Sequence, residues 1–293
     1  MSLPSAIDEE VGRLLGDAVR ASTPVAGGDI NDAWRCELAS GGRAFVKSRG
    51  GAEPAEFEAE AAGLRWLAEP GAAAVPAVLG VGEESAWIAL EWIEPGSLHA
   101  EGAEALGQGL AELHLAGATG HGALPPGSPD AVLRVGSVEL PAGESDSWPR
   151  VYAEERLLPL VVRARDSGSL AAADGTAVER VCERIEELAG PPEPPSRLHG
   201  DLWGGNVHAG ADGRPWLIDP AAHGGHREVD LAMLRLFGSP GERLFAAYDE
   251  AYPLADGHPD RVALWQLFPL LVHAVLFGGS YGAAAGNAAR QYV

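Results

Sequence analysis

The sequence predicts an α+β fold in two lobes, a small strand-rich lobe followed by a larger, mainly helical one. Short apolar runs separated by turn residues dominate up to residue 93, and longer segments with helical periodicity follow from residue 94. The chain has 293 residues, of which 46% are hydrophobic. A chain of this size can bury a core for roughly one to two domains. We therefore expect an N-terminal lobe at residues 1–93 and a C-terminal lobe at residues 94–293.

The first lobe begins with an apolar stripe at helical spacing, which predicts a helix within residues 1–22. Two strands are expected at 33–38 and 44–47, on either side of a Ser-Gly-Gly turn. A helix over 54–68 and strands over 77–81 and 87–92 complete this lobe.

The second lobe is predicted to be mainly helical. Segments with helical periodicity run over 104–116, 148–165, 176–189, 228–237, 240–250 and 259–277. The segment 117–147 is rich in Gly and Pro and is predicted to be a loop.

Charge and cysteine content exclude several classes of function. The net charge of −21 argues against nucleic acid as a partner, because phosphate backbones attract basic surfaces. Two cysteines cannot form a disulfide framework or a zinc site. No uninterrupted apolar run approaches the ~18 residues of a membrane span. We expect a cytoplasmic monomer that binds neither membrane nor nucleic acid.

Lys47 is the only lysine among 21 basic residues. Exposed positions tolerate either lysine or arginine, so a lone lysine is consistent with a site that needs a compact ammonium group. On composition alone, this functional interpretation and the chance survival of one lysine in an arginine-rich chain are equally supported.

The segment 199–220 carries the most specific pattern in the chain. Asp212-Gly213 is a strong turn signal between two short apolar runs, which predicts a hairpin. The open ends of an antiparallel hairpin meet, so Asn206 before the first strand is expected beside Asp219 after the second, about 5 Å away. An amide oxygen and a carboxylate at that separation suit Mg²⁺.

Asp201 lies in the loop that leads into this hairpin, five residues before Asn206. There it can accept a proton from a substrate hydroxyl. Asp-x4-Asn followed by a strand-terminal Asp is the arrangement of a kinase catalytic loop and its metal aspartate. A surface hairpin in which Asp and Asn only form turns is the alternative, and the full string at this spacing argues against it.

Besides the metal, phosphoryl transfer needs a cationic side chain that binds the nucleotide phosphates. Lys47 ends a predicted strand, and Glu60 lies on the apolar stripe of the following helix, whereas Glu56 and Glu58 point elsewhere. A core-facing carboxylate needs a partner, so we expect Glu60 to pair with Lys47. The alternative places Glu60 in solvent at the margin of the stripe.

Two further segments are candidates for nucleotide binding. Gly27, Gly28, Asp29, Ile30 and Asn31 precede the first predicted strand and could close over the phosphates with backbone N–H groups. Glu91, Trp92 and Ile93 lie where strands give way to helices, at the position of a hinge that pairs with the adenine edge.

At these residues the chain resembles the fructosamine kinase (ketosamine-3-kinase) family, relatives of the aminoglycoside phosphotransferases. The string His-Gly-Asp-Leu-Trp-Gly-Gly-Asn at 199–206 and the segments 218–221 and 225–233 carry the resemblance. It implies a bilobal protein-kinase-like fold, ATP and Mg²⁺ as cofactors, and phosphorylation of a sugar hydroxyl on ketoamines, free or protein-bound. It makes Asp201 the base, Asn206 and Asp219 metal ligands, Lys47 the phosphate clamp and Glu60 its partner.

The resemblance also suggests substrate contacts for Trp203, His226, Trp265 and His273. His199 is expected to brace the catalytic loop rather than act as a base, and Asp230 to brace it rather than react. Asp29 stands where some family members carry a cysteine linked to redox control, so the resemblance does not carry such control over to this chain. An aminoglycoside or choline-like phosphotransferase and a nucleotide-binding pseudokinase remain as alternatives.

Overall fold

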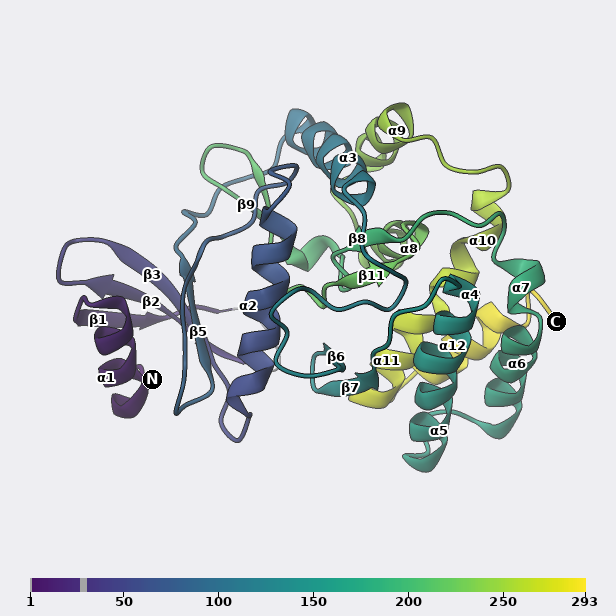
Figure 1. Ribbon diagram of the computed structural model, residues 1–293, viewed down its shortest axis with the longest axis horizontal. Coiled ribbons are helices and arrows are strands. Elements are labelled where there is room, and N and C mark those ends of the chain that lie inside the picture. Colours follow the sequence, from purple (N-terminus) through teal and green to yellow (C-terminus); the bar gives the residue numbers. More distant parts are fainter. Residues whose placement is uncertain (1, 27–30) are drawn as a thin grey trace.

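The computed structural model describes residues 2–26 and 31–293 and shows a sheet-containing lobe beside a larger helical lobe (Figure 1). The two chain termini lie at opposite ends of the long axis. The α+β architecture predicted from the sequence is confirmed.

A five-stranded antiparallel sheet forms the first lobe, in the order β1-β2-β3-β5-β4. The strands are β1 (Val19–Pro24), β2 (Asp32–Leu38), β3 (Arg43–Ser48), β4 (Val78–Val81) and β5 (Trp87–Glu91). Four of them match predicted strands.

Alternation along β3 determines where Lys47 points. Side chains alternate between the two faces of a strand, so Val46 and Lys47 face opposite sides. Val46 is buried with residues of α1 (Ser5–Leu15), whereas Phe45 packs with residues of α2 (Pro54–Ala68). Lys47 therefore lies on the α2 face, and α2 stands between the sheet and the helical lobe (Figure 1).

The predicted opening helix over 1–22 is wrong in its second half. α1 ends at Leu15, and Gly16 follows in the left-handed conformation with φ 64°. Glycine at this position ends helices because it has no Cβ to clash. Val19, which continued the apolar spacing in sequence, begins strand β1 instead.

The second lobe contains the remaining helices. They are α3 (Ala100–Leu115), α4 (Trp148–Val151), a π-helical turn (Tyr152–Leu157), α5 (Leu158–Asp166), α6 (Ala172–Glu183), α7 (Ile185–Leu188), α8 (Glu228–Phe237), α9 (Glu242–Ala251), α10 (His258–Trp265), α11 (Leu267–Phe277) and α12 (Tyr281–Ala289). The predicted boundary between residues 93 and 94 falls in the connection from β5 to α3.

Three pairs of short antiparallel strands are inserted among these helices. They are β6 (Val132–Val135) with β7 (Val138–Pro141), β8 (Ser196–Leu198) with β11 (His223–Gly225), and β9 (Val207–Ala209) with β10 (Pro215–Leu217). The loop predicted over 117–147 thus contains a hairpin. Its four-residue strands are too short to produce a clear period in the sequence.

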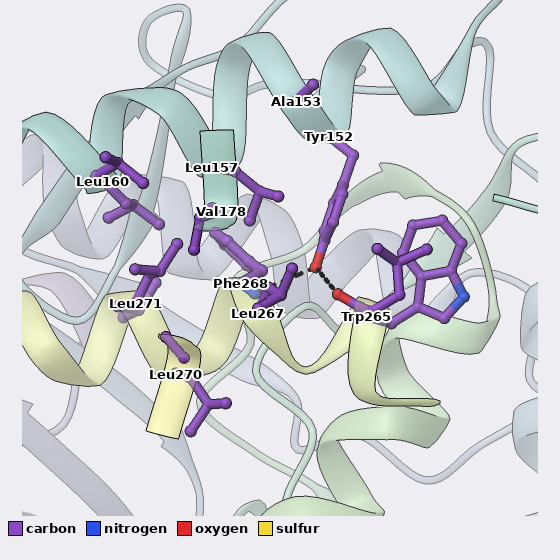
Figure 2. Packing of buried hydrophobic residues seen from close by; sticks show 14 of the residues in the cluster. Tyr152, Ala153, Leu157, Leu160, Val178, Trp265, Leu267, Phe268, Leu270 and Leu271 are labelled. Atoms are coloured by element: carbon purple, nitrogen blue, oxygen red, sulfur yellow. Dashed lines mark hydrogen bonds between the residues drawn. The ribbon is translucent and has the colours of Figure 1, made fainter. Parts of the chain in front are cut away.

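The core of the helical lobe forms around Tyr152 and Trp265 (Figure 2). Both side chains are fully buried, with ring centroids 5.0 Å apart in an edge-to-face arrangement. The Tyr152 hydroxyl donates to the Leu264 carbonyl at 2.8 Å and accepts from the Phe268 N–H at 3.1 Å. These bonds satisfy backbone groups where α10 gives way to α11, so the helix predicted over 259–277 is divided here.

One segment of the described chain, His258–Phe277, is long and apolar enough to cross a membrane by length and composition alone. Its most apolar window is 56% buried inside the protein. Several of its side chains, including Leu264, Trp265 and Leu271, belong to the core of the helical lobe. Burial in that core accounts for its apolar character.

Glu10 fastens α1 to the turn between β4 and β5. The side chain is 7% exposed, and its carboxylate accepts hydrogen bonds from Glu83 N, Glu84 N and Trp87 Nε1 at 2.7–3.0 Å. Burial alone would raise the pKa of Glu10, but these hydrogen bonds hold the pKa below its usual value.

Replacing Glu10 by Ala is expected to lower the free energy of unfolding by about 2–3 kcal/mol, since it orphans these donors. Because the folded-state pKa is depressed, the contribution of Glu10 is present at neutral pH and declines as the pH falls through that pKa. Denaturant unfolding at neutral and acidic pH tests this. The exposed neighbour Glu9→Ala is the control, and equal effects of the two variants would contradict the prediction.

Candidate functional site

The predicted hairpin is present, with β9 and β10 paired in the register Val207↔Leu217, His208↔Trp216 and Ala209↔Pro215. Gly213 adopts φ 78°, which the Asp-Gly turn requires. At the open end, Ile218 N–H donates to the Asn206 carbonyl at 3.1 Å. The hairpin therefore brings Asn206 beside Asp219, as the sequence predicts.

The Asn206 side chain links the three polar residues of the site. Its Nδ2 donates to the Asp201 carbonyl at 2.8 Å, to the Asp201 carboxylate at 3.1 Å and to the Asp219 carbonyl at 3.4 Å. With Nδ2 committed to these acceptors, Oδ1 is the atom that Asn206 can offer to a cation.

Asp219 is the only non-glycine residue with positive φ in the described part of the chain, at φ 54°. Left-handed backbone costs about 1–3 kcal/mol for residues with a Cβ, and such residues concentrate at functional sites. The conformation turns the chain from β10 into Pro220. It leaves the Asp219 side chain 44% exposed and in contact with Lys47.

Lys47 joins the two lobes. Its Nζ lies 2.8 Å from the Glu60 carboxylate and 2.6 Å from Asp219 Oδ1. The predicted pairing of Lys47 with Glu60 is confirmed, and the contact with Asp219 is an addition that the sequence did not reveal. Lys47 is only 4% exposed. Burial disfavours the ammonium, but the two carboxylates outweigh it and raise the pKa of Lys47, so this residue remains charged.

The Asp201 carboxylate lies in the same cluster. Burial and the nearby charge of Asp219 raise the pKa of Asp201 to about 7, against the opposing effect of the hydrogen bond from Asn206. A cation held by Asn206 and Asp219 would lower this pKa by favouring the ionised form. A carboxylate poised near neutral pH can accept a proton from a hydroxyl group.

Asp230 and His199 hold the loop that contains Asp201 through hydrogen bonds. The buried Asp230 carboxylate accepts hydrogen bonds from His199 N–H at 2.8 Å and Gly200 N–H at 2.9 Å. His199 Nδ1 accepts from Asp201 N–H at 3.3 Å, and its Nε2 donates to the Ile218 carbonyl at 2.9 Å. Both ring nitrogens are thus used inside the loop, which confirms the bracing role expected for His199 and Asp230.

These groups line a cavity of about 490 Å³ between the lobes. Lys47 and Glu60 contribute from the first lobe, and Asp201, Asn206 and Asp219 from the second. The structure therefore brings together these five residues, which the sequence predicted for one site, and we call them the polar end of the cavity.

The donor set fits a magnesium ion better than an all-protein metal cage. Among the described residues, no group of three or more His, Cys, Asp and Glu side chains could hold a metal. Mg²⁺ needs no such cage, because it takes one or two protein oxygens and completes its shell with water and phosphates. Asn206 Oδ1 and the half-exposed Asp219 carboxylate supply oxygens of this kind.

The predicted nucleotide segments lie partly outside the described residues. Gly27, Gly28, Asp29 and Ile30 are not described, whereas Asn31 lines the cavity. Glu91 ends β5, and Trp92 and Ile93 follow in the connection between the lobes; none of the three lines the cavity.

The connection between the lobes is tied to the β9–β10 hairpin. Gly96 N–H donates to the Ala209 carbonyl, and Ala211 N–H to the Glu94 carbonyl, both at 2.8 Å. A Cβ on Gly96 would come within 2.2 Å of the Gly210 oxygen, so only glycine permits this approach. The position of the hinge is thereby fixed relative to Asn206 and Asp219.

The structure separates the four predicted substrate residues. Trp203 and His273 line the cavity. His226 and Trp265 do not: Trp265 is fully buried and donates to Glu228 at 2.8 Å, and His226 stacks on its ring at 5.3 Å. Both are core residues. They pack against each other and against the buried ion pair of Glu228 with Arg261.

Sequence reasoning missed several residues of the cavity wall, among them Phe237, Phe277 and Tyr281. Each falls at an end of a helix, where its periodicity resembles that of a core position. No local signal distinguishes such a residue from its buried neighbours.

Replacing Asp230 by Ala removes the acceptor for two buried backbone donors and is expected to cost about 3 kcal/mol of unfolding free energy. Asp230→Asn retains one carbonyl oxygen and should cost less. Chemical denaturation measures both, with the exposed Asp166→Asn as control. An Asp230→Ala variant as stable as the wild type would show that the loop does not depend on this brace.

Comparison with known proteins places this geometry in a family. The profile of the fructosamine kinase family matches residues 5–293. A Thermus thermophilus protein named "Probable ketoamine kinase" is 37% identical over 265 residues, which cover 90% of this chain and 91% of that protein. The chloroplastic protein-ribulosamine 3-kinase of Oryza sativa subsp. indica is 32% identical, with coverage of 92% and 78%.

Comparison with solved structures indicates the same family. A candidate fructosamine-3-kinase from Thermobifida fusca superposes with a TM-score of 0.89, at 41% identity and 99% coverage of both chains. A type I macrolide 2′-phosphotransferase, at 20% identity and a TM-score of 0.65, shares the fold. The fold is therefore that of the kinase-like phosphotransferases, and the chain belongs to the fructosamine kinase family.

Proposed function

We propose that this protein is a MgATP-dependent kinase that phosphorylates a sugar hydroxyl of ketoamines, the adducts that sugars form with lysine and other amines. The observation that carries the proposal is the position of Lys47, which contacts Glu60 and Asp219 in the cavity that also contains Asp201. Relatives named as ketoamine and ribulosamine kinases support the acceptor class.

Each group of the polar end has a role in such a reaction. Lys47 would hold the nucleotide phosphates, positioned by Glu60. Asn206 Oδ1 and Asp219 would hold Mg²⁺, which supplies charge neutralisation of the phosphates when bound. Asp201 would orient the acceptor hydroxyl and take its proton. The backbone between Glu91 and Ile93 would pair with the adenine, and the glycine segment at 27–31 would cover the phosphates.

An assay of ADP formation tests the proposal most broadly. Fructosyl-, ribulosyl- and erythrulosyl-lysine should each be compared with an aminoglycoside set and choline, with and without Mg²⁺. We expect Mg²⁺-dependent ADP formation with at least one ketoamine. Turnover confined to aminoglycosides or choline would show that ketoamines are not the acceptor class. ATP binding without ADP formation from any acceptor would indicate a pseudokinase.

Asp201→Asn is expected to lower turnover by about 10²–10⁴-fold, the range that general bases contribute. ATP affinity should stay close to that of the wild type, because the amide preserves the shape of the side chain. Steady-state kinetics and equilibrium ATP binding measure the two quantities. Full activity in this variant would exclude Asp201 as the base.

Lys47→Arg should also abolish turnover, although it retains the charge. Lys47 is buried, and a planar guanidinium cannot replace a single ammonium between Glu60 and Asp219. The reverse exchange at an exposed position, Arg20→Lys, is the control. Wild-type turnover in Lys47→Arg would show that the site does not require a lysine. The single lysine of the chain would then be a coincidence of composition.

A further inference from the structure

The cavity that contains the proposed catalytic groups has a second, aromatic end. Phe237, His273, Phe277 and Tyr281 line it, from α8, α11 and α12. The His273 ring lies 4.3 Å from the Phe237 ring, 5.0 Å from Tyr281 and 5.4 Å from Phe277, centroid to centroid. The rings therefore form one continuous cluster around His273.

This aromatic cluster adjoins the catalytic loop. Gly204 N–H donates to the Gly238 carbonyl at 2.8 Å, which joins the loop after Trp203 to the residue after Phe237. Trp203, which also lines the cavity, is 39% exposed, and Phe277 is 50% exposed. Large aromatic side chains that remain open to solvent beside a cavity mark a surface available to a ligand.

The charges of the cavity leave the aromatic cluster open to a cation. Each basic residue that lines the cavity is already paired: Lys47 with Glu60 and Asp219, Arg49 with Glu56, and Arg134 with Asp130 and Glu139. His273 donates from Nδ1 to the Pro269 carbonyl at 2.8 Å, and burial lowers the pKa of His273, so its ring is neutral at neutral pH. No unpaired positive charge among the described lining residues would repel an amine.

We propose that the aromatic cluster binds the amine-bearing alkyl chain of the acceptor, with Phe277 as a specificity-determining residue for lysine adducts. The inference rests on the proposed function, since it assigns the part of the ketoamine that does not react. A ketoamine nitrogen is protonated near neutral pH, and ring faces attract cations. The methylene groups beyond it gain from contact with the half-exposed Phe277.

The polar and aromatic groups of the cavity lining set the direction of the acceptor. With the reacting hydroxyl at Asp201, the amine substituent is directed to the aromatic cluster, which adjoins the loop after Trp203. The exposure of Phe277 places the far end of this path at the solvent boundary, where an alkyl chain can leave toward a free or polypeptide-bound backbone. A polyhydroxylated carrier would instead need many polar partners, and the cluster offers only His273 Nε2 and the Tyr281 hydroxyl.

Two adducts of one sugar test this proposal, one with methylamine and one with the Nε of N-acetyl-lysine methylamide. The sugar is whichever ketose gives turnover in the ADP assay. The wild type should prefer the lysine adduct in kcat/KM. Phe277→Ala should lower kcat/KM for the lysine adduct by about five- to tenfold, mainly through KM, and reduce the methylamine adduct several times less.

Phe277→Tyr retains the ring and should retain the preference. Val162→Ala, another exposed apolar residue on a helix outside the cavity, is the matched control. Equal losses on both adducts, or a wild type that does not distinguish them, would overturn the role of Phe277 while leaving the kinase activity established. Absence of turnover with every ketoamine would overturn the proposed function and this inference together.

Discussion

The contact of one ammonium group with two carboxylates connects the parts of this protein. Lys47 reaches Glu60 on α2 and Asp219 at the end of the hairpin, at 2.8 and 2.6 Å. These residues come from a strand, a helix and a segment 172 positions later in the chain. A buried charge is tolerated only when it is paired. Removal of either carboxylate would therefore destabilise the lobe interface, because the buried ammonium of Lys47 would lose a partner. The same requirement aligns the two lobes across the cavity.

The rest of the site is held by hydrogen bonds to backbone groups. Asp230 fixes the catalytic loop through two N–H groups, and the hairpin fixes Asn206 opposite Asp219. Gly96 then ties the connection between the lobes to the end of β9 in that hairpin. The positions of the proposed reacting groups are thus set by rigid elements, which is the arrangement that phosphoryl transfer requires when most of catalysis is positioning.

The polar end of the site could be predicted because its information is local. A tight turn places Asn206 beside Asp219, and alternation along β3 orients Lys47 toward α2. The aromatic end could not, because Phe237, Phe277 and Tyr281 meet only through the packing of helices distant in sequence. His226 and Trp265 illustrate the same limit, since their burial depends on Glu228 and Arg261. Likewise, Gly16 ended a helix that apolar spacing alone would have extended.

Calorimetric titration of ATP, with and without Mg²⁺, against the wild type and Asp219→Asn tests the central claim most directly. If Asp219 and Asn206 hold a metal that bridges to nucleotide phosphates, Mg²⁺ should tighten ATP binding to the wild type. The variant should lose most of that metal-dependent gain while still binding ATP. An identical gain in the two proteins would contradict the account, because the metal would then be held elsewhere.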